Sequence, residues 1–409
     1  MAPSGDDSNS GLTQKQPFRT LQRAADQTRP GDTVLIADGR YSAPGRPNVL
    51  GITRSGEPDR WITYAAAPNA RPVIEGGEGN WQIVHVRAAY IRVVGLSAVG
   101  NRARLTAEQR DRAQRGDLKD PAINGNCFTA DEQKSADPPR RPHHVHFWGN
   151  TATDCALAGF STLAADHVTM EYNVAARNSW YSGYSGSCFS VNGSWNSDDD
   201  TGYKMIIRGN VAHDCRQIVP SAVIGADRPT SGHGFSIELN RNEHLREAPL
   251  SQDRYRGLIL VADNVAYGNG GHGIAVYDSD NVAVLNNTLY HNAETPHLSG
   301  EVIVRGAERV AVANNIAVAR TGKVAVGVNR VGATRLANNL LVGVQELPAG
   351  IAGGTLVGQP SFVDPAAGDF RLNADSPAVD AGAPTAGTTT DADRLPRDSR
   401  PDLGAYERR

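Results

Sequence analysis

Short apolar stretches that end in asparagine recur through the middle of the chain. They read HVHFWGN, VTMEYN, MIIRGN, LILVADN, VAVLNN, VAVANN and RLANN, and they end at Asn150, Asn173, Asn210, Asn264, Asn287, Asn315 and Asn339. Where the spacing is tight, the period is 23 to 28 residues, which is typical of parallel β-helix coils stacked roughly 4.8 Å apart. Asparagine at a fixed turn accepts the left-handed conformation and hydrogen-bonds to its equivalent in the next coil. The pattern therefore predicts an asparagine ladder.

A second register lies upstream of the asparagine strands. The segments GNCFTAD, LAGFSTL, GSCFSVN, GHGFSIE and GHGIAVY align to give one column of Phe128, Phe160, Phe189, Phe235 and Ile274. Two residues later, a second apolar column contains Ala130, Thr162, Val191, Ile237 and Val276. Because side chains alternate along a strand, both columns are predicted to point inward. The outward columns are then Thr129, Ser161, Ser190, Ser236 and Ala275, followed by Asp131, Leu163, Asn192, Glu238 and Tyr277.

The two ends of the chain have different patterns. Residues 17–28 have the apolar spacing of an amphipathic helix, which we expect to cap the open end of the coils. Residues from about 355 onward are rich in Pro, Asp and Gly and predict a loop-rich cap. We therefore predict one domain over 1–409, made of an N-terminal segment with a capping helix at 1–35, coils at 36–354 and a C-terminal cap at 355–409. Charged loop insertions are predicted near 101–145, 193–203, 217–232 and 240–256.

The composition agrees with many short strands and excludes several classes of partner. The chain of 409 residues contains 43 Gly and only 3 Met, which suits strands and tight turns better than long helices. A net charge of -3 argues against nucleic acid as a partner. No run of about 18 apolar residues occurs, so membrane insertion is not expected. The start, MAPSGDDSNSG, lacks the features of a signal peptide, and we expect a secreted or periplasmic chain whose leader has been removed.

The four cysteines follow the repeat and match no zinc or redox motif. A small polar residue stands five positions after five of the ladder asparagines, at Cys155, Asn178, Cys215, Asn269 and Asn292. Cys155 and Cys215 thus share a column two coils apart, and Cys127 and Cys188 share another. A separation of roughly 10 Å within a column excludes a disulfide. All four cysteines are predicted to be small core or turn residues.

Several segments resemble a known group of proteins over nearly the whole chain. They are PFRTLQRAADQTRPGDTVLIADGRY near the start, PVIEG at 72–76, the asparagine-ended coils and DLGAYER near the end. In these segments the chain resembles secreted right-handed β-helix proteins, and in particular the family 9 polysaccharide lyases, which are pectate-lyase-like enzymes. The resemblance implies an all-β fold, a single-stranded right-handed parallel β-helix or solenoid, with sugar bound on the outward face of the strands in the phenylalanine column.

The resemblance also implies a calcium cage of aspartates and a catalytic lysine, in the contexts ADGF, SDDGFD and NGFK. ADGF falls on GSCF, which places Ser187 where an aspartate is needed. SDDGFD falls on SGHGFS, which supplies Gly232, His233 and Ser236, and NGFK falls on GHGIA, with Ala275 in place of the lysine. Because none of these functional residues is kept, we do not expect pectate lyase activity by that mechanism.

Two histidines depart from the repeat at the place where the related lyases keep their site. His233 and His272 occupy equivalent positions in consecutive coils, so their rings should lie on one side of the solenoid, within about 8 Å. Glu238, Tyr277 and Asp278 follow on the outward face. Two imidazoles beside a carboxylate can act as acid and base near neutral pH or share a divalent metal. The alternative is that both are solvated turn residues.

An aromatic segment and an acidic loop supply further candidates. NSWYSGYSGSCFS contains Trp180, Tyr181 and Tyr184; exposed aromatic rings stack on sugars, and tyrosine can act as an acid or base, whereas the alternative is a turn stabilised by tyrosines. GSWNSDDDTGYK contains three aspartates that suit calcium or are simply solvated, Asp198, Asp199 and Asp200. The predicted substrate-binding residues are Trp180, Asn192, Lys204, Arg216, Arg241, Tyr277 and Asp278.

These patterns together predict a secreted, monomeric carbohydrate-active enzyme that cleaves a polysaccharide or oligosaccharide. The first hypothesis is a polysaccharide lyase that acts by β-elimination on a uronate-containing glycan, with a histidine or tyrosine base among His233, His272, Tyr181 and Tyr184. Cationic side chains would neutralise the uronate carboxylate. The alternatives are a glycoside hydrolase with a carboxylate pair that includes Glu238 and a non-catalytic glycan-binding or adhesion β-helix. Calcium is the only cofactor that the sequence suggests.

Overall fold

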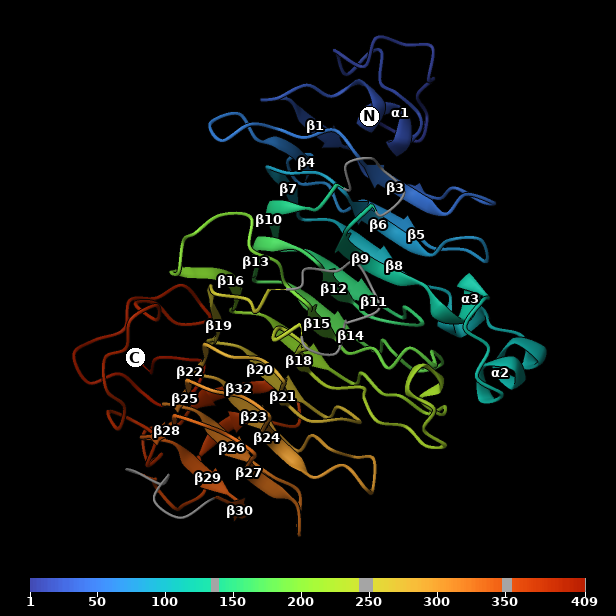
Figure 1. The fold of residues 1–409 in the computed structure, drawn as a ribbon. Helices are drawn as coiled ribbons and strands as arrows, with labels where there is room; N and C mark the ends of the chain where they lie inside the picture. Colours follow the sequence, from blue (N-terminus) through green and yellow to red (C-terminus); the bar gives the residue numbers. More distant parts are fainter. Residues whose placement is uncertain (134–139, 243–252, 348–354, 409) are drawn as a thin grey trace. The chain divides into compact units, whose positions relative to one another are not determined.

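The computed structural model describes residues 1–133, 140–242, 253–347 and 355–408. Among these residues, thirty strands belong to three parallel sheets of ten, here called sheets A, B and C (Figure 1). Successive strands along the chain enter the three sheets in turn, so that each coil contributes one strand to each sheet. This arrangement confirms the parallel β-helix that the repeat predicts.

Each sheet collects the strands that share one position in the repeat. Sheet A contains β1 (Thr33–Ile36), β4 (Ile62–Ala66), β7 (Ile91–Val94), β10 (His143–Trp148), β13 (Asp166–Glu171), β16 (Tyr203–Arg208), β19 (Leu258–Ala262), β22 (Val282–Leu285), β25 (Val310–Ala313) and β28 (Thr334–Ala337). Sheet B contains β2 (Arg40–Tyr41), β5 (Val73–Glu75), β8 (Ser97–Val99), β11 (Thr151–Thr153), β14 (Val174–Ala176), β17 (Val211–His213), β20 (Val265–Tyr267), β23 (Thr288–Tyr290), β26 (Ile316–Val318) and β29 (Leu340–Val342). Sheet C contains β3 (Asn48–Ile52), β6 (Gln82–Val86), β9 (Asn126–Asp131), β12 (Phe160–Leu163), β15 (Phe189–Asn192), β18 (Phe235–Glu238), β21 (Ile274–Tyr277), β24 (Gly300–Arg305), β27 (Val324–Asn329) and β30 (Val344–Glu346).

By its internal contacts the chain forms two compact units. Unit 1 comprises Met1–Thr169, Asn173–Ser190 and Gln217–Thr230, and unit 2 comprises Met170–Tyr172, Val191–Arg216 and Ser231–Arg409. The division of the chain into one domain with an N-terminal segment, coils and a C-terminal cap stays a prediction.

A short helix packs against the first sheet C strand of unit 1, as the sequence predicts. The helix, α1 (Leu21–Gln27), begins after Thr20, whose hydroxyl accepts a hydrogen bond from the backbone N–H of Arg23 and so satisfies one exposed donor of the first turn. Its leucine and alanines are buried, and the helix lies next to β3 (Figure 1). The Gln22 amide donates to the carbonyl of Gly51 and accepts from its N–H, which ties the helix to the edge of that strand.

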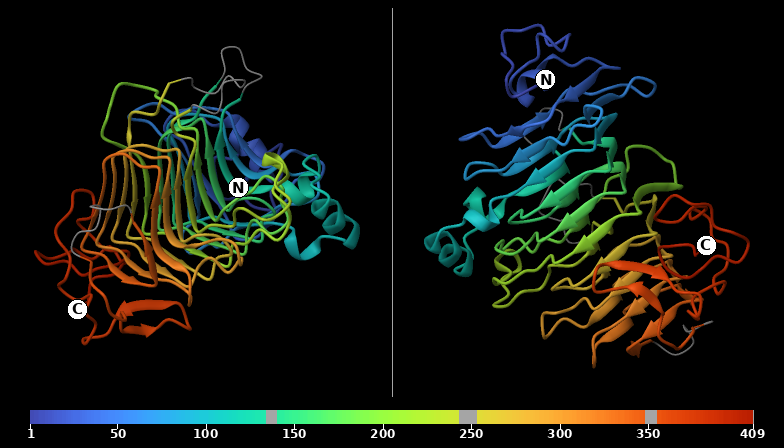
Figure 2. Two further views of the ribbon diagram at one scale, coloured as in Figure 1. Left: turned by 60° about the horizontal axis from the view of Figure 1, so that its bottom comes forward. Right: turned by 180° about the vertical axis from the view of Figure 1, so that it is seen from behind.

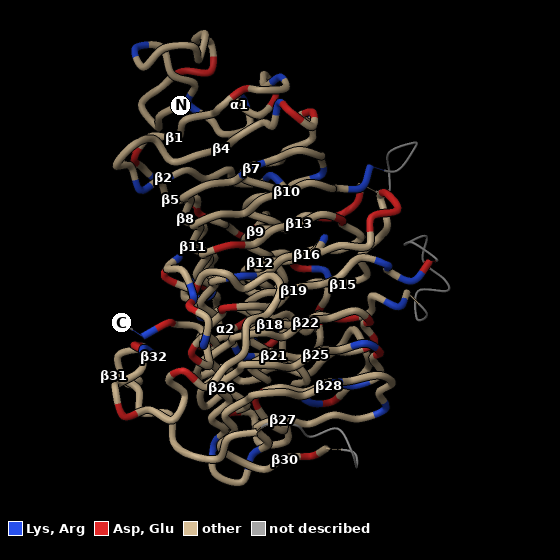
Figure 3. The backbone as a smooth tube through the Cα atoms, turned by 90° about the vertical axis from the view of Figure 1, so that its left-hand side faces the viewer, with Lys and Arg blue, Asp and Glu red and all other residues tan. Residues whose placement is uncertain are grey.

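Aromatic rings fill the predicted inward column. In unit 1 the rings of Phe128, Phe160 and Phe189 stack at centroid distances of 4.8 and 4.9 Å. In unit 2, Phe235 and Ile274 are register partners on neighbouring strands. All five side chains are buried, whereas Lys, Arg, Asp and Glu lie mostly at turns and in loops (Figure 3). The period-two alternation in the sequence therefore identified the core correctly.

The asparagine ladder is present, with one difference in the backbone. The side-chain oxygen of Asn287 accepts hydrogen bonds from the N–H and Nδ2 of Asn264 at 3.1 and 3.0 Å, and Asn287 donates in the same way to Asn315. The left-handed residue is the one before the ladder asparagine, as at Asn286 with φ 53°. The ladder residues themselves are not left-handed, so that prediction is wrong. Their side-chain amides turn into the coil, where each binds the equivalent asparagine of the next coil.

The insertion near 101–145 was predicted as a loop, and that prediction is wrong. It contains a 3-10 helix, η1 (Arg102–Arg104), and two α-helices, α2 (Ala107–Gln114) and α3 (Pro121–Asn124). A capping box between Thr106 and Gln109 begins α2. The charged surface of the segment hid a small apolar cluster that the helices bury, Leu105, Ala113, Ala122, Ile123 and Val219.

The other predicted insertions are mostly irregular. The 3-10 helix η2 (Ala222–Ile224) lies within 217–232, and no helix or strand lies between β15 and β16 in the described residues of the predicted insertion at 193–203. Residues 134–139 and 243–252, which belong to the insertions predicted near 101–145 and 240–256, lie outside the described residues.

The C-terminal segment packs along the side of sheet B in unit 2, whereas the sequence predicted a loop-rich cap on the coils. It contains an antiparallel hairpin of β31 (Phe362–Asp364) and β32 (Asp369–Leu372) beside the coils (Figure 2). Phe370 packs against Val265 of β20, and Leu403 packs against Ile316 of β26. These sheet B positions face outward and are apolar, so they need cover from solvent. The inward columns used for the prediction do not include these outward positions, so the sequence did not predict that the C-terminal segment covers them.

The prediction that no disulfide forms is wrong. Cys127 and Cys155 form a disulfide with a Cα–Cα distance of 5.8 Å. Cys188 and Cys215 are also disulfide-bonded, and no described cysteine is free. Comparison within columns missed the bridge because Cys127 lies in β9, whereas Cys155 follows β11 in the next coil. The corner after a sheet B strand thus lies beside the start of the sheet C strand one coil earlier.

Replacing Cys127 and Cys155 together with alanine is expected to lower the free energy of unfolding by about 3 kcal/mol. The bridge closes a segment with a sequence separation of 28 residues, and a loop of this length restricts the unfolded chain by about that amount. Urea unfolding of the two proteins measures the difference. A loss below about 1 kcal/mol would contradict the expectation, provided that a thiol assay shows the other two cysteines still oxidised.

Candidate functional site

A polar row crosses three neighbouring strands of sheet C in unit 2. Glu238 ends β18, Tyr277 ends β21 and Arg305 ends β24, and the three residues are partners in the parallel register. They point outward because the residues before them, such as Ile237 and Val276, are buried in the core. The sequence predicted Glu238 and Tyr277 in one outward column. It did not predict Arg305.

The side chains of this row influence one another. The Arg305 Cζ lies 4.6 Å from the centroid of the Tyr277 ring, and Ser236 Oγ donates to Glu238 Oε1 at 2.5 Å. Burial raises the pKa of Glu238, and the Asp278 charge raises it further, against opposing contributions from Ser236 and Arg305. Burial and the Glu238 charge also raise the pKa of Tyr277, so that its phenol is protonated at neutral pH. The row thus contains a carboxyl group, a phenol and a guanidinium.

The two predicted histidines stack beside the row. The ring centroids of His233 and His272 are 4.8 Å apart with an interplanar angle of 8°, and the His272 N–H donates to His233 Nδ1 at 2.8 Å. The Tyr277 ring is edge-on to both, at 6.2 and 6.3 Å. The rings therefore lie on the same side and within the expected distance. They are only 1% and 3% exposed, so the alternative of solvated turn residues is wrong.

The environment of the pair differs from the one expected for groups that titrate near neutral pH. Burial lowers the pKa of His233 well below its ordinary value, and the charge of His272 adds to the effect. Burial lowers the pKa of His272 to about 4. Both imidazoles are neutral at pH 7, and His272 Nδ1 lies 3.1 Å from the carbonyl oxygen of Gly300. A catalytic role for either ring stays a prediction; what the contacts show is a buried support for the Tyr277 ring.

The buried ring of His272 is expected to make the protein less stable as the pH falls from about 6.5 to about 4. Its folded pKa is about 4, below the value of about 6.5 in the unfolded chain. The unfolded chain therefore binds the proton first, and the free energy of unfolding decreases with falling pH. The shift corresponds to about 3 kcal/mol. The measurement is urea unfolding of the wild type, His272→Gln and His272→Phe across this range.

Both variants lack the titrating ring of His272, so both should lose the same pH-dependent contribution to the free energy of unfolding. The stability advantage of the wild type over either variant should therefore decline by about the same amount as the pH drops. A difference that does not vary with pH in both variants would show that the ring titrates normally.

Glu301 is a buried carboxyl group that the sequence reasoning missed. It lies in β24, is 0% exposed and accepts hydrogen bonds from the Asn292 N–H at 2.9 Å and Nδ2 at 2.6 Å. Asn269 donates in turn to Asn292, so Glu301 ends a second ladder. Burial raises its pKa to about 8. The sequence did contain a signal for this residue, because Glu301 stands within the apolar stretch GEVIVR. An acidic residue in a buried strand is rarely found without partners.

A cavity of about 560 Å³ adjoins the row at Arg305. Asn329, the register partner of Arg305 on β27, lines it, together with Arg330, Glu346 and Ile303. The outward row therefore continues into a hollow over the next coils of unit 2. Two guanidinium groups beside a single carboxylate favour a ligand that carries a negative charge.

The predicted aromatic candidates belong to unit 1. Tyr181 packs against the apolar cluster of the helical insertion, and Arg102 Cζ lies 4.6 Å from the Trp180 ring centroid. Tyr184 is 39% exposed and donates its hydroxyl to the carbonyl of Leu118 at 3.1 Å. These contacts account for the aromatic segment structurally. The catalytic roles of the tyrosines and the substrate-binding role of Trp180 stay predictions.

The predicted cationic candidates in unit 2 each have an acidic partner. The ion pairs are Lys204 with Asp198 at 2.7 Å, Arg216 with Glu294 at 2.6 Å and Arg241 with Asp280 at 2.8 Å. Lys204 is 1% exposed, so its charge lies inside the protein. Asn192 is half-buried at the end of β15, and Asp278 follows β21 close enough to Glu238 to raise its pKa. The Gly193 N–H donates to the carbonyl of Glu238 at 3.1 Å, which places Asn192 beside Glu238 on the neighbouring strand, so Asn192 and Asp278 both adjoin the row.

The residues at the positions of the family's calcium cage do not fit calcium. Ser187, His233, Ser236 and Ala275 supply no carboxylate, and all four are buried, whereas calcium takes six to eight oxygen ligands. The three aspartates predicted to bind a metal also contact protein groups. Asp198 pairs with Lys204, Asp199 pairs with Arg256 at 2.8 Å, and Asp200 accepts a hydrogen bond from the Gly202 N–H at 2.8 Å.

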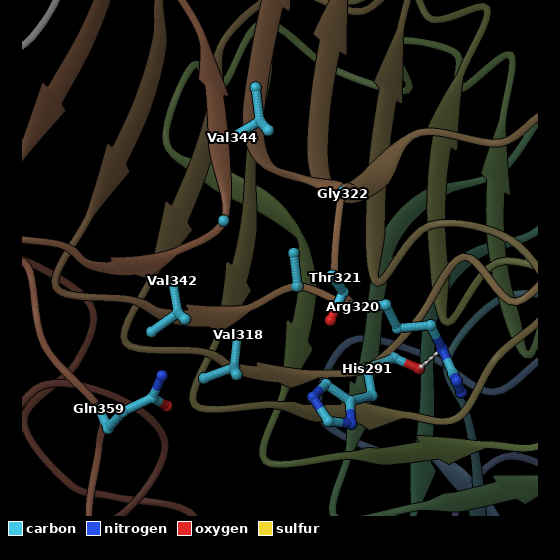
Figure 4. A pocket seen from close by; sticks show the side chains of 10 residues that line it. His291, Val318, Arg320, Thr321, Gly322, Val342, Val344 and Gln359 are labelled. Carbon is cyan, nitrogen blue, oxygen red and sulfur yellow. Dashed lines mark hydrogen bonds between the residues drawn. The ribbon is translucent and has the colours of Figure 1, made fainter.

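A second cavity, of about 520 Å³, lies at the ends of sheet B strands in unit 2 (Figure 4). Val318 and Val342 form its apolar wall, and His291 and Arg320 lie at its side. The Arg320 Nε donates to the carbonyl of His291 at 2.8 Å, and its NH2 group pairs with Glu294 at 2.6 Å. Because this guanidinium is engaged and no predicted candidate lines the cavity, we assign it no chemistry.

The fold and its outward polar row place the protein among the parallel β-helix proteins. Residues 1–301 match the family described as Pel9A-like, right handed beta helix region. The chain belongs to this family. The match confirms both the predicted resemblance and the right-handed sense of the coils.

Solved structures share this fold over most of both chains. Pectate lyase Pel9A is 17% identical with a TM-score of 0.54, covering 100% of this chain and 96% of that one. A rhamnogalacturonan lyase is 18% identical with a TM-score of 0.51, covering 85% and 88%. XylC in complex with xylose is 10% identical with a TM-score of 0.52, covering 99% and 97%. At these identities the likeness establishes the fold.

One curated protein matches in sequence over a short segment. The uncharacterized protein YwoF of Bacillus subtilis (strain 168) is 36% identical over 76 residues. The match spans 19% of this chain and 15% of that relative's length.

Two features bear on the environment of the protein. Within the described ranges, none of the helices combines the length and the apolar character needed to cross a bilayer. All four cysteines are oxidised, which fits an extracellular protein because disulfides persist mainly in oxidising compartments.

Proposed function

We propose that the protein is a polysaccharide lyase that cleaves a uronate-containing glycan by β-elimination at the row of Glu238, Tyr277 and Arg305. The observation that carries the proposal is that these three side chains are register partners on consecutive strands. They combine the base, acid and cation that this reaction needs on an outward face. Membership of the Pel9A-like family and the fold shared with proteins named as pectate and rhamnogalacturonan lyases support a polysaccharide substrate.

Each residue of the row has a role in the proposed elimination. The Arg305 guanidinium pairs with the uronate carboxylate and so makes the proton on C5 more acidic. The Glu238 carboxylate removes that proton, and the electron pair forms the C4–C5 double bond as the bond from C4 to the glycosidic oxygen breaks. Tyr277 donates its phenolic proton to the departing oxygen. Its raised pKa keeps that proton in place before the reaction, and the raised pKa of Glu238 makes its carboxylate a stronger base.

The test is incubation of the full chain with uronate-containing and neutral polysaccharides. A lyase produces an unsaturated uronate that absorbs in the ultraviolet, together with an equal number of new reducing ends. New reducing ends without that absorbance would identify a hydrolase. Binding without products would identify a glycan-binding protein, and either result would overturn the proposal.

One observation favours the hydrolase as the second candidate. The Asp278 charge raises the pKa of Glu238, so the two carboxyl groups lie near each other. A glycoside hydrolase needs such a pair, one group as acid and the other as base or nucleophile. Loss of hydrolysis in both Glu238→Gln and Asp278→Asn, with no unsaturated product in the wild type, would identify this mechanism.

The remaining expectations complete the proposal. We place the protein outside the cytoplasm, secreted or in a periplasm, as a monomer acting on a polysaccharide or oligosaccharide. Calcium at Asp198, Asp199 and Asp200 is an expectation of its own, which activity measured with and without a chelator tests. Loss of activity on chelation, restored by added calcium, would support it. Unchanged activity would exclude calcium without affecting the proposed roles of the row.

A further inference from the structure

Two adjacent histidines in unit 1 bring their side-chain nitrogens together at the start of β10. The Nδ1 atoms of His143 and His144 are 2.8 Å apart. Neighbouring residues of a strand normally point to opposite faces. His144 has a left-handed backbone with φ 52°, which turns its ring to the same side as that of His143.

The rings are held in place by an aromatic stack from neighbouring coils. The His144 ring stacks on Tyr90 at 4.7 Å and on His167 at 4.3 Å, and the Tyr90 ring is also edge-on to His143 at 5.3 Å. The Trp61 ring is edge-on to Tyr90 at 5.8 Å. Tyr90 and His167 are themselves left-handed, so these coils share one turn geometry. The two nitrogens are therefore positioned in advance on partly exposed rings.

We propose that His143 and His144 bind a divalent transition-metal cation, such as Zn²⁺ or Cu²⁺, through their Nδ1 atoms. Metal–imidazole bonds are about 2.0–2.1 Å long, so two nitrogens on one ion lie roughly 2.9–3.4 Å apart. The observed 2.8 Å needs a shift of only a few tenths of an ångström. Imidazole nitrogen suits zinc, copper and nickel, whereas calcium prefers oxygen ligands. The site uses none of the residues of the proposed elimination.

Without an ion, the close approach is an N–H···N hydrogen bond in which one ring carries a hydrogen on Nδ1 and the other Nδ1 accepts it. Metal binding replaces that hydrogen, which is released as a proton. The same two nitrogen atoms therefore form the hydrogen bond without the ion and hold the ion when it is bound. The surrounding rings do not need to move far between these two states.

The test is titration of the tag-free full chain with Zn²⁺ alone and with Cu²⁺ alone, by calorimetry and by electron paramagnetic resonance respectively. The wild type should bind one ion, and its Cu²⁺ spectrum should show coupling to two imidazole nitrogens. His144→Tyr removes one ligand but keeps an aromatic ring in the stack, of the same type as Tyr90 one coil earlier. His143→Gln removes the other ligand. Each variant should bind at least about tenfold more weakly, since loss of even an outer-shell partner typically has that effect.

His213→Gln is the matched control, because His213 also stacks on a tyrosine, Tyr267, at 4.9 Å. Its metal affinity should equal that of the wild type. Circular dichroism and the unfolding midpoint report whether the variants fold. Failure of the wild type to bind one ion, or equal binding by folded His143→Gln and His144→Tyr, would overturn the proposal. Neither result depends on polysaccharide cleavage, so the site and the proposed function fail separately.

Discussion

Replacing Glu238 with glutamine is expected to lower kcat/KM on a uronate-containing polysaccharide by about 100-fold or more. A positioned general base typically contributes at least this factor. The glutamine has nearly the same shape, and its oxygen still accepts the hydrogen bond from Ser236, so the fold should persist. The measurement is the initial rate of ultraviolet absorbance from the unsaturated product, together with the unfolding midpoint of each protein.

The neighbouring residues of the row sharpen this prediction. Tyr277→Phe keeps the ring beneath Arg305 but removes the proton donor, and should reduce the rate by a similar factor. Arg305→Ala should weaken turnover of uronate substrates because their carboxylate is no longer neutralised. Glu78→Gln, at an exposed glutamate in unit 1, should retain full activity. If Glu238→Gln keeps more than about a third of the wild-type rate, this carboxylate is not the base.

Replacing Asn287 with leucine is expected to lower the free energy of unfolding by about 3 kcal/mol or more. The Asn287 amide bridges Asn264 and Asn315 and also donates to the carbonyl of Val261 at 2.9 Å. Leucine has a similar volume but no polar atoms, so it leaves buried donors and acceptors in both neighbouring coils without partners. Each unsatisfied buried group costs about 1–3 kcal/mol. Urea unfolding monitored by circular dichroism measures the loss.

A matched asparagine outside the ladder provides the control. Asn69 is exposed with φ 63°, a conformation that glycine adopts freely. Asn69→Gly should therefore change the free energy of unfolding by less than about 1 kcal/mol. A loss at Asn287 no larger than at Asn69 would mean that the ladder does not stabilise the coils.

Features that repeat from coil to coil were predictable. The Phe128 column, the ladder through Asn287 and the outward pairing of Glu238 with Tyr277 all follow from aligning one coil with the next. In a parallel β-helix a residue's nearest partner in space is its equivalent in the next coil. Arg305 was within reach of the same reasoning, because continuing the alignment from GHGIAVY to GEVIVR places it beside Tyr277.

Features that join different columns were not predictable in this way. The bridge from Cys127 to Cys155 crosses from sheet C to the corner after sheet B, so comparison within columns excluded it. The histidine pair was correctly placed in one column, but its burial depends on Tyr277 and on the backbone of Gly300. That burial, rather than the presence of two histidines, determines the directions of their pKa shifts.

The sequence by itself determined the β-helix, its inward columns, its ladder and the strand face where the polar row lies, because periodic side chains encode contacts between equivalent residues. Only the tertiary structure decided the disulfide, the helices of the insertion, the cover over sheet B, the buried Glu301 and the close nitrogens of His143 and His144. These features depend on contacts between unlike positions and on single backbone conformations. A repeat period does not specify either.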